Sequence, residues 1–179
     1  ISNEFSKILL GYIATIENDH LRAYLMPVVS GEHGRVVNNH AHHSHPYLLS
    51  KLCLDIGIDA SAIRPLNFTA SFIKALRKSS KNTMFGFGLI GIGNEKMLLK
   101  EYKAVEDSFS AHYPDAIYRP FLYANINEDG HHSKLIENAA TSICASSDDA
   151  KEFISGAKLG IKARVDYYDK LLAYSVSNK

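Results

Sequence analysis

Apolar residues recur at helical spacing along nearly the whole chain, and this periodicity constrains the fold more than any other feature. Side chains three and four positions apart share one face of a helix, whereas a half-buried strand alternates apolar and polar residues. No stretch sustains that alternation. We therefore expect an all-α bundle of about six to seven helices. The segments that carry the pattern are residues 5–30, 46–58, 67–80, 84–112, 117–145 and 149–175.

Local signals agree with these segments. Pro46 suits a first helical turn, and Asp149 followed by Glu152 has the spacing of a capping box. The segment 31–44 is the one long irregular connection that we expect, and loops of that length are often functional.

The 179 residues form one expected domain, 1–179, with a net charge of +1. This near-neutral balance predicts neither nucleic acid nor an anionic membrane as a partner. The longest apolar runs, 21–29 and 84–92, are too short to span a bilayer, and no signal peptide opens the chain. Two cysteines in apolar settings behave as small buried side chains more often than as a disulfide. We expect a cytoplasmic protein.

The run GFGLIG at 86–91 spells the dinucleotide-binding fingerprint G-x-G-x-x-G. That fingerprint requires a strand before it and a helix opening at it, and the run lies inside an apolar helical stretch instead. We expect the glycines to permit close packing of a neighbouring helix.

Carboxylates and imidazoles continue the apolar faces of three expected helices. Glu32 extends the stripe of Leu21, Leu25 and Val28, and Glu95 lies three residues after Ile92. A third stripe steps by three or four through Phe121, Asn125, Asp129, His132 and Ile136. A buried carboxylate is costly unless it is neutralised, paired or bound to a cation. Helical bundles build di-iron and di-manganese sites from such inward-facing Glu and His, so we expect a metal site.

Each residue also has a simpler interpretation. Glu32 alone could be an exposed residue at a helix end, and Asp129 with His132 could form a structural hydrogen-bonded pair. Five of the nine histidines fall between His33 and His45, and most of these are expected to be solvated loop residues.

Five segments together resemble the haem-oxygenase-like di-iron oxidases, the superfamily of CADD-like and TenA-like folds. They are EHG at 32–34, HPYLL at 45–49, LDIGID at 54–59, GIGNE at 91–95 and NINEDGHH at 125–132. The resemblance implies a haem-oxygenase-like helical bundle. It covers the chain from about residue 5 but lacks the family's first helix, in keeping with a start that is not Met.

Carried over by position, the resemblance implies an Fe(II) site of one or two ions. The implied ligands are Glu32, His45, Glu95, Asn125, Asp129 and His132. Asn125 departs from the pattern, which has a His there. An amide oxygen is a poorer iron ligand than imidazole, so the number of irons stays open.

The resemblance further implies an enzyme that uses dioxygen to oxidise a small carboxylate-bearing metabolite, such as an amino acid or a fatty acid. Glu32 and Glu95 would act at the metal, and Tyr102, two turns from Glu95, would line the pocket. Two alternatives stay open: a metal-free TenA-like hydrolase with a Cys nucleophile, and a non-catalytic, partner-binding helical bundle. The oligomeric state is also open, with a homodimer one alternative, because a missing first helix would expose apolar surface.

Overall fold

The computed structural model describes residues 1–37, 40–42, 44–115 and 119–177, and only the backbone of 35–37, 40–42 and 129. Its elements in chain order are α1 (Ser2–Ala14), α2 (Asp19–His33), β1 (Arg35–Val37), β2 (His40–His42), α3 (His45–Asp55), η1 (Ala60–Ala62), α4 (Asn67–Leu76), η2 (Arg77–Lys81), α5 (Thr83–Phe87), η3 (Gly88–Glu95), α6 (Lys96–His112), α7 (Pro120–Ile143) and α8 (Ser147–Ser177). The all-helical class expected from the periodicity is confirmed. Among the described residues, no helix combines the length and the hydropathy that crossing a bilayer requires.

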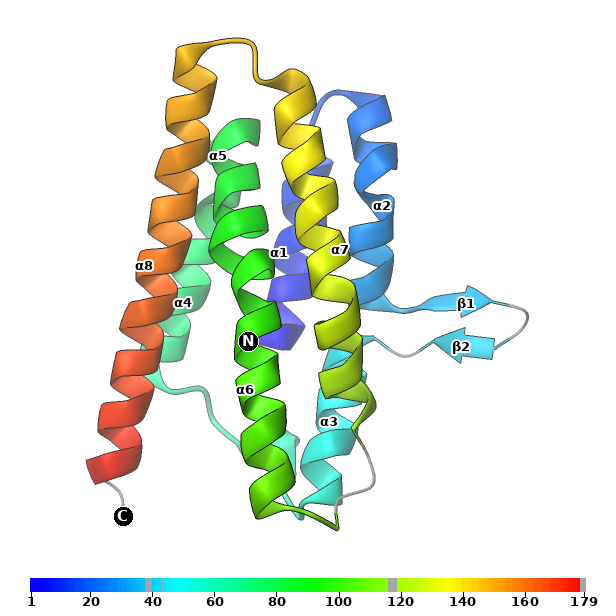
Figure 1. Cartoon of the computed structure of the whole chain (residues 1–179), viewed down its shortest axis with the longest axis vertical. Helices are drawn as coiled ribbons and strands as arrows, with labels where there is room; N and C mark the ends of the chain where they lie inside the picture. The colour runs from blue at the N-terminus through cyan, green and yellow to red at the C-terminus, as the bar shows by residue number, and fades with distance from the viewer. Residues whose placement is uncertain (38–39, 43, 116–118, 178–179) are drawn as a thin grey trace.

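The long helices pack side by side as a bundle (Figure 1). α5, η3 and α6 form one continuous column, with α8 along one side and α7 along the other (Figure 1). α2 packs against α7, α1 packs against α2, and α3 lies beside the lower half of α7. The column therefore brings the middle of the chain into contact with both of its C-terminal helices.

The helix expected over 5–30 is two helices. The Asn18 side chain accepts a hydrogen bond from the Leu21 amide and so caps a new helix, α2, after a turn. Arg22 braces the turn by donating to the carbonyl oxygens of Ile16 and Glu17 at 2.5 and 2.9 Å. The sequence pattern missed the break because Leu10 and Ile13 keep a helical spacing, although Leu10 is exposed.

The cap of the last helix is also displaced from the expected one. Ser146 Oγ accepts from the Asp149 amide at 3.1 Å, and Asp149 Oδ2 accepts from the Ser146 amide at 3.0 Å. These reciprocal bonds form a capping box three residues earlier than the predicted pair of Asp149 and Glu152. Glu152 instead pairs with Lys81 at 3.1 Å.

The segment expected as an irregular loop contains a short antiparallel hairpin that extends sideways from the bundle (Figure 1). Its register pairs Arg35 with His42 and Val37 with His40. Strands of three residues are too short for an alternating pattern to be visible in the sequence.

The glycines of the rejected nucleotide motif lie where helices cross closely, as expected. A Cβ on Gly88 would overlap the carbonyl oxygen of Phe153 in α8, and a Cβ on Gly156 would overlap that of Phe85. Further along, a Cβ on Gly93 would lie 2.6 Å from Gly160 Cα. The absence of side chains at these positions lets α8 pack backbone to backbone against α5 and η3.

The column changes its helical winding between α5 and α6. Residues Gly88–Glu95 form a π-helix, in which the hydrogen bonds skip one residue more than in an α-helix. Such insertions are rare and concentrate at functional sites. This one ends at Glu95, one of the residues expected to bind metal.

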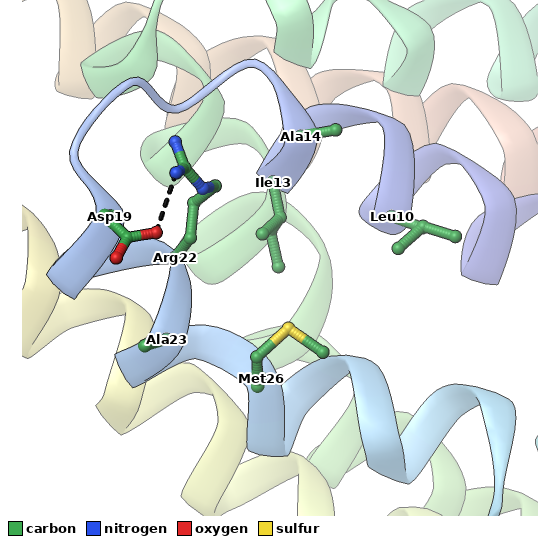
Figure 2. A pocket seen from close by; sticks show the side chains of 7 residues that line it. All are labelled: Leu10, Ile13, Ala14, Asp19, Arg22, Ala23 and Met26. Carbon is green, nitrogen blue, oxygen red and sulfur yellow. Dashed lines mark hydrogen bonds and ion pairs between the residues drawn. The ribbon is translucent and has the colours of Figure 1, made fainter.

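A groove of about 330 Å³ lies on the surface between α1 and α2 (Figure 2). Most of its lining is apolar, and the lining also includes the ion pair of 2.8 Å between Arg22 and Asp19. None of its lining residues is an expected metal ligand.

Candidate metal centre

Glu32 lies near the C-terminal end of α2, on the stripe predicted from the sequence. Leu21, Leu25 and Val28 of that stripe are buried, and Glu32 is buried with them, with 2% of its surface exposed. Gly34 then leaves the helix with a φ of 73°, a conformation that glycine adopts without strain. Glu32 is therefore the last inward-facing residue of α2, and the helix ends directly after it.

Glu95 is the last residue of η3 and is completely buried. Neither of its carboxylate oxygens has a hydrogen-bond partner among the described residues. Burial raises the pKa of this carboxyl group above 4.5, the nearby Glu32 raises it further, and His132 and His45 oppose the shift. Among the described residues, no lysine or arginine contributes to that shift.

His132 comes from α7 and is also buried. Its Nδ1 lies 3.5 Å from Glu95 Oε2, beyond a normal hydrogen bond, and makes no hydrogen bond within the described part of the chain. The imidazole fits beside α2 only because residue 31 is glycine. A Cβ on Gly31 would lie 2.5 Å from His132 Cε1 and 2.7 Å from its Nε2.

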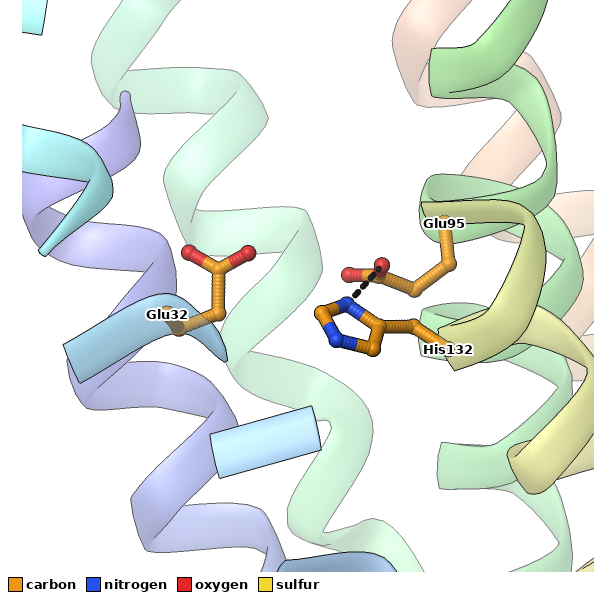
Figure 3. Close-up of side chains that lie close together, drawn as sticks. All are labelled: Glu32, Glu95 and His132. Carbon is orange, nitrogen blue, oxygen red and sulfur yellow. Dashed lines mark ion pairs between the residues drawn. The ribbon is translucent and has the colours of Figure 1, made fainter. Parts of the chain in front are cut away.

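Atoms of Glu32, Glu95 and His132 come together within 4.8 Å of one another. Figure 3 shows the two carboxylates facing each other from α2 and η3, with the imidazole beside them. The three residues come from three different helices and none is exposed. Two carboxylates and one imidazole, buried and with orphaned oxygens, are the donor set that a divalent cation would satisfy.

His45 extends this group on the side of α3. It begins α3 just after Ser44, whose side chain accepts from the Tyr47 amide. Its Nδ1 lies 3.0 Å from Glu32 Oε1, and its ring stands edge-on to Phe121 at 6.3 Å between centroids. His45 is therefore placed either to bind the ion itself or to orient Glu32.

The other two expected ligands, Asn125 and Asp129, are less clearly part of the centre than Glu32, His45, Glu95 and His132. Asn125 is buried on α7, but its amide nitrogen donates to the carbonyl oxygen of Phe121 at 2.6 Å, so only its amide oxygen remains for a metal. The side chain of Asp129 lies outside the described residues.

Tyr102 packs in a second apolar cluster with Leu52, Phe121 and Leu122. Its ring is edge-on to Phe121 at 5.3 Å, and Phe121 also contacts His45. Phe121 thus connects Tyr102 to the centre, and the expected catalytic role of Tyr102 stays a prediction.

The structure adds Glu128, which the sequence analysis did not consider. Glu128 Oε2 lies 3.8 Å from His45 Nε2 and 2.9 Å from the position a Cβ on Gly31 would take. Because 47% of its side chain is exposed, Glu128 lies at the boundary between the buried centre and solvent. Its spacing of four residues before His132 is a signal that could have identified it, but it lies one residue off the apolar stripe.

Among the described side chains, the other histidines and the two cysteines are not part of this centre. His33 Nε2 lies 2.9 Å from the Ser6 carbonyl oxygen, and the side chains of His40, His42 and His43 lie outside the described residues. Cys144 is exposed, and burial raises the pKa of the partly buried Cys53 thiol. A raised pKa favours the thiol over the nucleophilic thiolate, which weakens the Cys-hydrolase alternative.

Comparison with known proteins gave no match to a family model, to a curated protein or to a solved structure.

Proposed function

We propose that this protein is a non-haem iron enzyme that binds Fe(II) through Glu32, Glu95 and His132, with His45 as a further ligand. In this proposal it uses dioxygen to oxidise a small carboxylate-bearing metabolite, such as an amino acid or a fatty acid. The observation that carries the proposal is the fully buried Glu95, whose two oxygens accept no hydrogen bond among the described residues and lie near a second buried carboxylate.

A cation explains this arrangement better than a structural polar network does. In a structural network the buried polar atoms satisfy one another, because an unpaired buried oxygen costs roughly 1–3 kcal/mol. Here Glu95 accepts no hydrogen bond from the part of the chain that the structure describes, and the charges beside it include a second carboxylate. A divalent ion between them would neutralise both acids at once.

The donor set narrows the choice of metal. Mixed carboxylate and imidazole ligands suit iron or manganese better than calcium, which prefers oxygen alone. The segments around Glu32, His45, Glu95 and His132 resemble haem-oxygenase-like di-iron oxidases, and the all-α bundle is compatible with that fold. This resemblance favours iron and supports the choice of a dioxygen-dependent oxidation.

Bound ferrous iron would supply electrons for dioxygen reduction and coordination positions for dioxygen and substrate. The protein's own groups have separate tasks. Glu32 and Glu95 provide negative charge that favours the cation, and Glu95 must release any proton it carries before it can bind. The packed helices exclude water from the centre, while Glu128 provides a carboxylate between the centre and solvent.

One ion is better supported than two. Glu32, Glu95 and His132 already supply three ligands to a single position. A second position would depend on the amide oxygen of Asn125 and on Asp129.

Anaerobic titration with Fe(II), followed by elemental analysis after desalting, tests the proposal. We expect about one iron per wild-type chain and less than a tenth of that for Glu95→Gln, which keeps the shape of the side chain but loses its charge. Glu17→Gln, at an exposed position between α1 and α2, is the matched control and should retain iron. Wild-type protein that holds no iron would instead favour the partner-binding bundle. Iron-loaded protein that consumes no dioxygen with amino or fatty acids would overturn the oxidase assignment.

A further inference from the structure

Arg164 of α8 is a buried cation outside the candidate centre. Only 6% of its surface is exposed, and it was not among the residues that the sequence singled out. A buried guanidinium is costly unless it is fully paired, so its partners indicate its purpose.

Two of those partners belong to the π segment that ends at Glu95. Arg164 donates through one terminal nitrogen to Asn94 Oδ1, and its Nε lies 3.4 Å from the Gly93 carbonyl oxygen. Asn94 is itself buried and directly precedes Glu95.

The other contacts of Arg164 hold the guanidinium in place. Its second terminal nitrogen donates to Glu101 on α6, and Tyr168 on α8 donates to the same carboxylate oxygen at 3.1 Å. The guanidinium also stacks over the ring of Phe72 at 5.4 Å. Arg164 therefore joins α8 to both sides of the junction between η3 and α6.

The π winding decides where Glu95 points. An α-helical winding over the same residues would rotate Glu95 about the helix axis, because the two helices differ in residues per turn. The close contact between Gly93 and Gly160 brings α8 near this segment, and Arg164 lies one turn beyond Gly160 on the same helix. Arg164 is thus placed to oppose the return of η3 to an α-helix.

We infer that Arg164 is a positioning residue of the metal centre. Through Asn94 and the Gly93 carbonyl it holds η3 in the winding that presents Glu95 to Glu32 and His132. The inference rests on the proposed metal site, although Arg164 itself touches neither the ion nor a ligand.

The test compares metal affinity with folding stability, using Co(II) as a spectroscopic probe under anaerobic conditions. Arg164→Met keeps an unbranched apolar stem and removes the hydrogen bonds of the guanidinium. We expect its Co(II) affinity to fall at least tenfold, in the range that loss of an outer partner causes, with a changed visible spectrum. Arg164→Lys should recover part of the Co(II) affinity and part of the wild-type visible spectrum.

Three further variants separate positioning from general stability. Asn94→Ala removes the same link while leaving the Arg164–Glu101 pair, and it should lower Co(II) affinity as Arg164→Met does. Glu101→Gln should leave affinity within twofold, because the glutamine amide oxygen can still accept from Arg164 and the bond to Asn94 survives. Leu76→Ala, in the core of α4, should lower the melting temperature and leave the Co(II) spectrum unchanged.

The outcomes are distinct. Wild-type protein that binds Co(II), together with Arg164→Met and Asn94→Ala that bind it equally well, would overturn the inference and leave the metal site standing. If Arg164→Met does not fold, Asn94→Ala decides by the same comparison. Wild-type protein that binds no Co(II) or Fe(II) would overturn both the site and the inference.

Discussion

Glu32 of α2 and Glu95 of η3 present carboxylate oxygens within 4.8 Å of each other in the interior of the bundle (Figure 3). Both side chains are buried, so little water screens their repulsion. Without a cation, protonation is the way in which such a pair avoids two adjacent charges.

Metal affinity should rise with pH. Because burial and Glu32 raise the pKa of Glu95 above 4.5, a proton competes with the metal until the pH exceeds that raised value. Isothermal titration with Co(II) in several buffers should show about one proton released per ion when the pH lies below that pKa. Affinity that does not change from pH 4.5 to pH 7.5 would contradict this prediction.

The stability of the metal-free protein should show the opposite trend at this residue. A carboxyl whose pKa is raised on folding stabilises the folded state while it is protonated, and that contribution is lost as pH rises through the folded-state pKa. The free energy of unfolding of Glu95→Gln minus that of the wild type should therefore increase with pH above 4.5. Urea denaturation across this range measures the difference, and a constant value would show that Glu95 has an ordinary pKa.

Gly31→Ala should damage the centre without adding any charge. Its Cβ would lie 2.5 Å from His132 Cε1, and the buried ring has little room to retreat. We expect a loss of about 1–3 kcal/mol in stability and at least a tenfold loss of metal affinity. Gly11→Ala, in α1 with nothing within 4 Å of the new Cβ, is the matched control and should be neutral or stabilising. Equal behaviour of the two variants would show that His132 does not depend on Gly31.

Asn125→His tests whether the centre stops at one ion. The pattern of the family that the sequence resembles has a histidine here, and imidazole is a better iron ligand than an amide oxygen. The Asn125 amide nitrogen already donates to the Phe121 carbonyl oxygen. Elemental analysis should give about one iron per wild-type chain and a ratio closer to two for Asn125→His. A ratio that stays at one would show that residue 125 does not limit the number of ions.

Gly156→Ala tests the packing of α8 against α5. The added Cβ would overlap the Phe85 carbonyl oxygen, which is backbone and cannot rotate away. We expect a loss of at least about 2 kcal/mol in the free energy of unfolding. Gly130→Ala, where the nearest atom is Leu99 Cδ2 at 3.9 Å, should leave it unchanged or raise it. Similar values for the two variants would contradict the close crossing.

The sequence pattern predicted where the helices lie more accurately than where each helix begins and ends. The break at Asn18 and the cap at Ser146 depend on single side-chain bonds, which a periodicity over ten or more residues does not register. The π winding of η3 was also invisible, because the apolar run from Phe85 to Ile92 fits either type of helix.

The sequence by itself determined that this chain forms helices and that Glu32, Glu95 and His132 lie on faces turned inward, because side-chain spacing along one helix is a local property. Tertiary structure alone decided that these faces meet. Tertiary structure also places Glu128 beside His45, and it places the Arg164 cation against the end of η3. Such relationships depend on how separate helices cross, and crossing is set by close contacts, such as that of Gly93 with Gly160, between residues far apart in the chain.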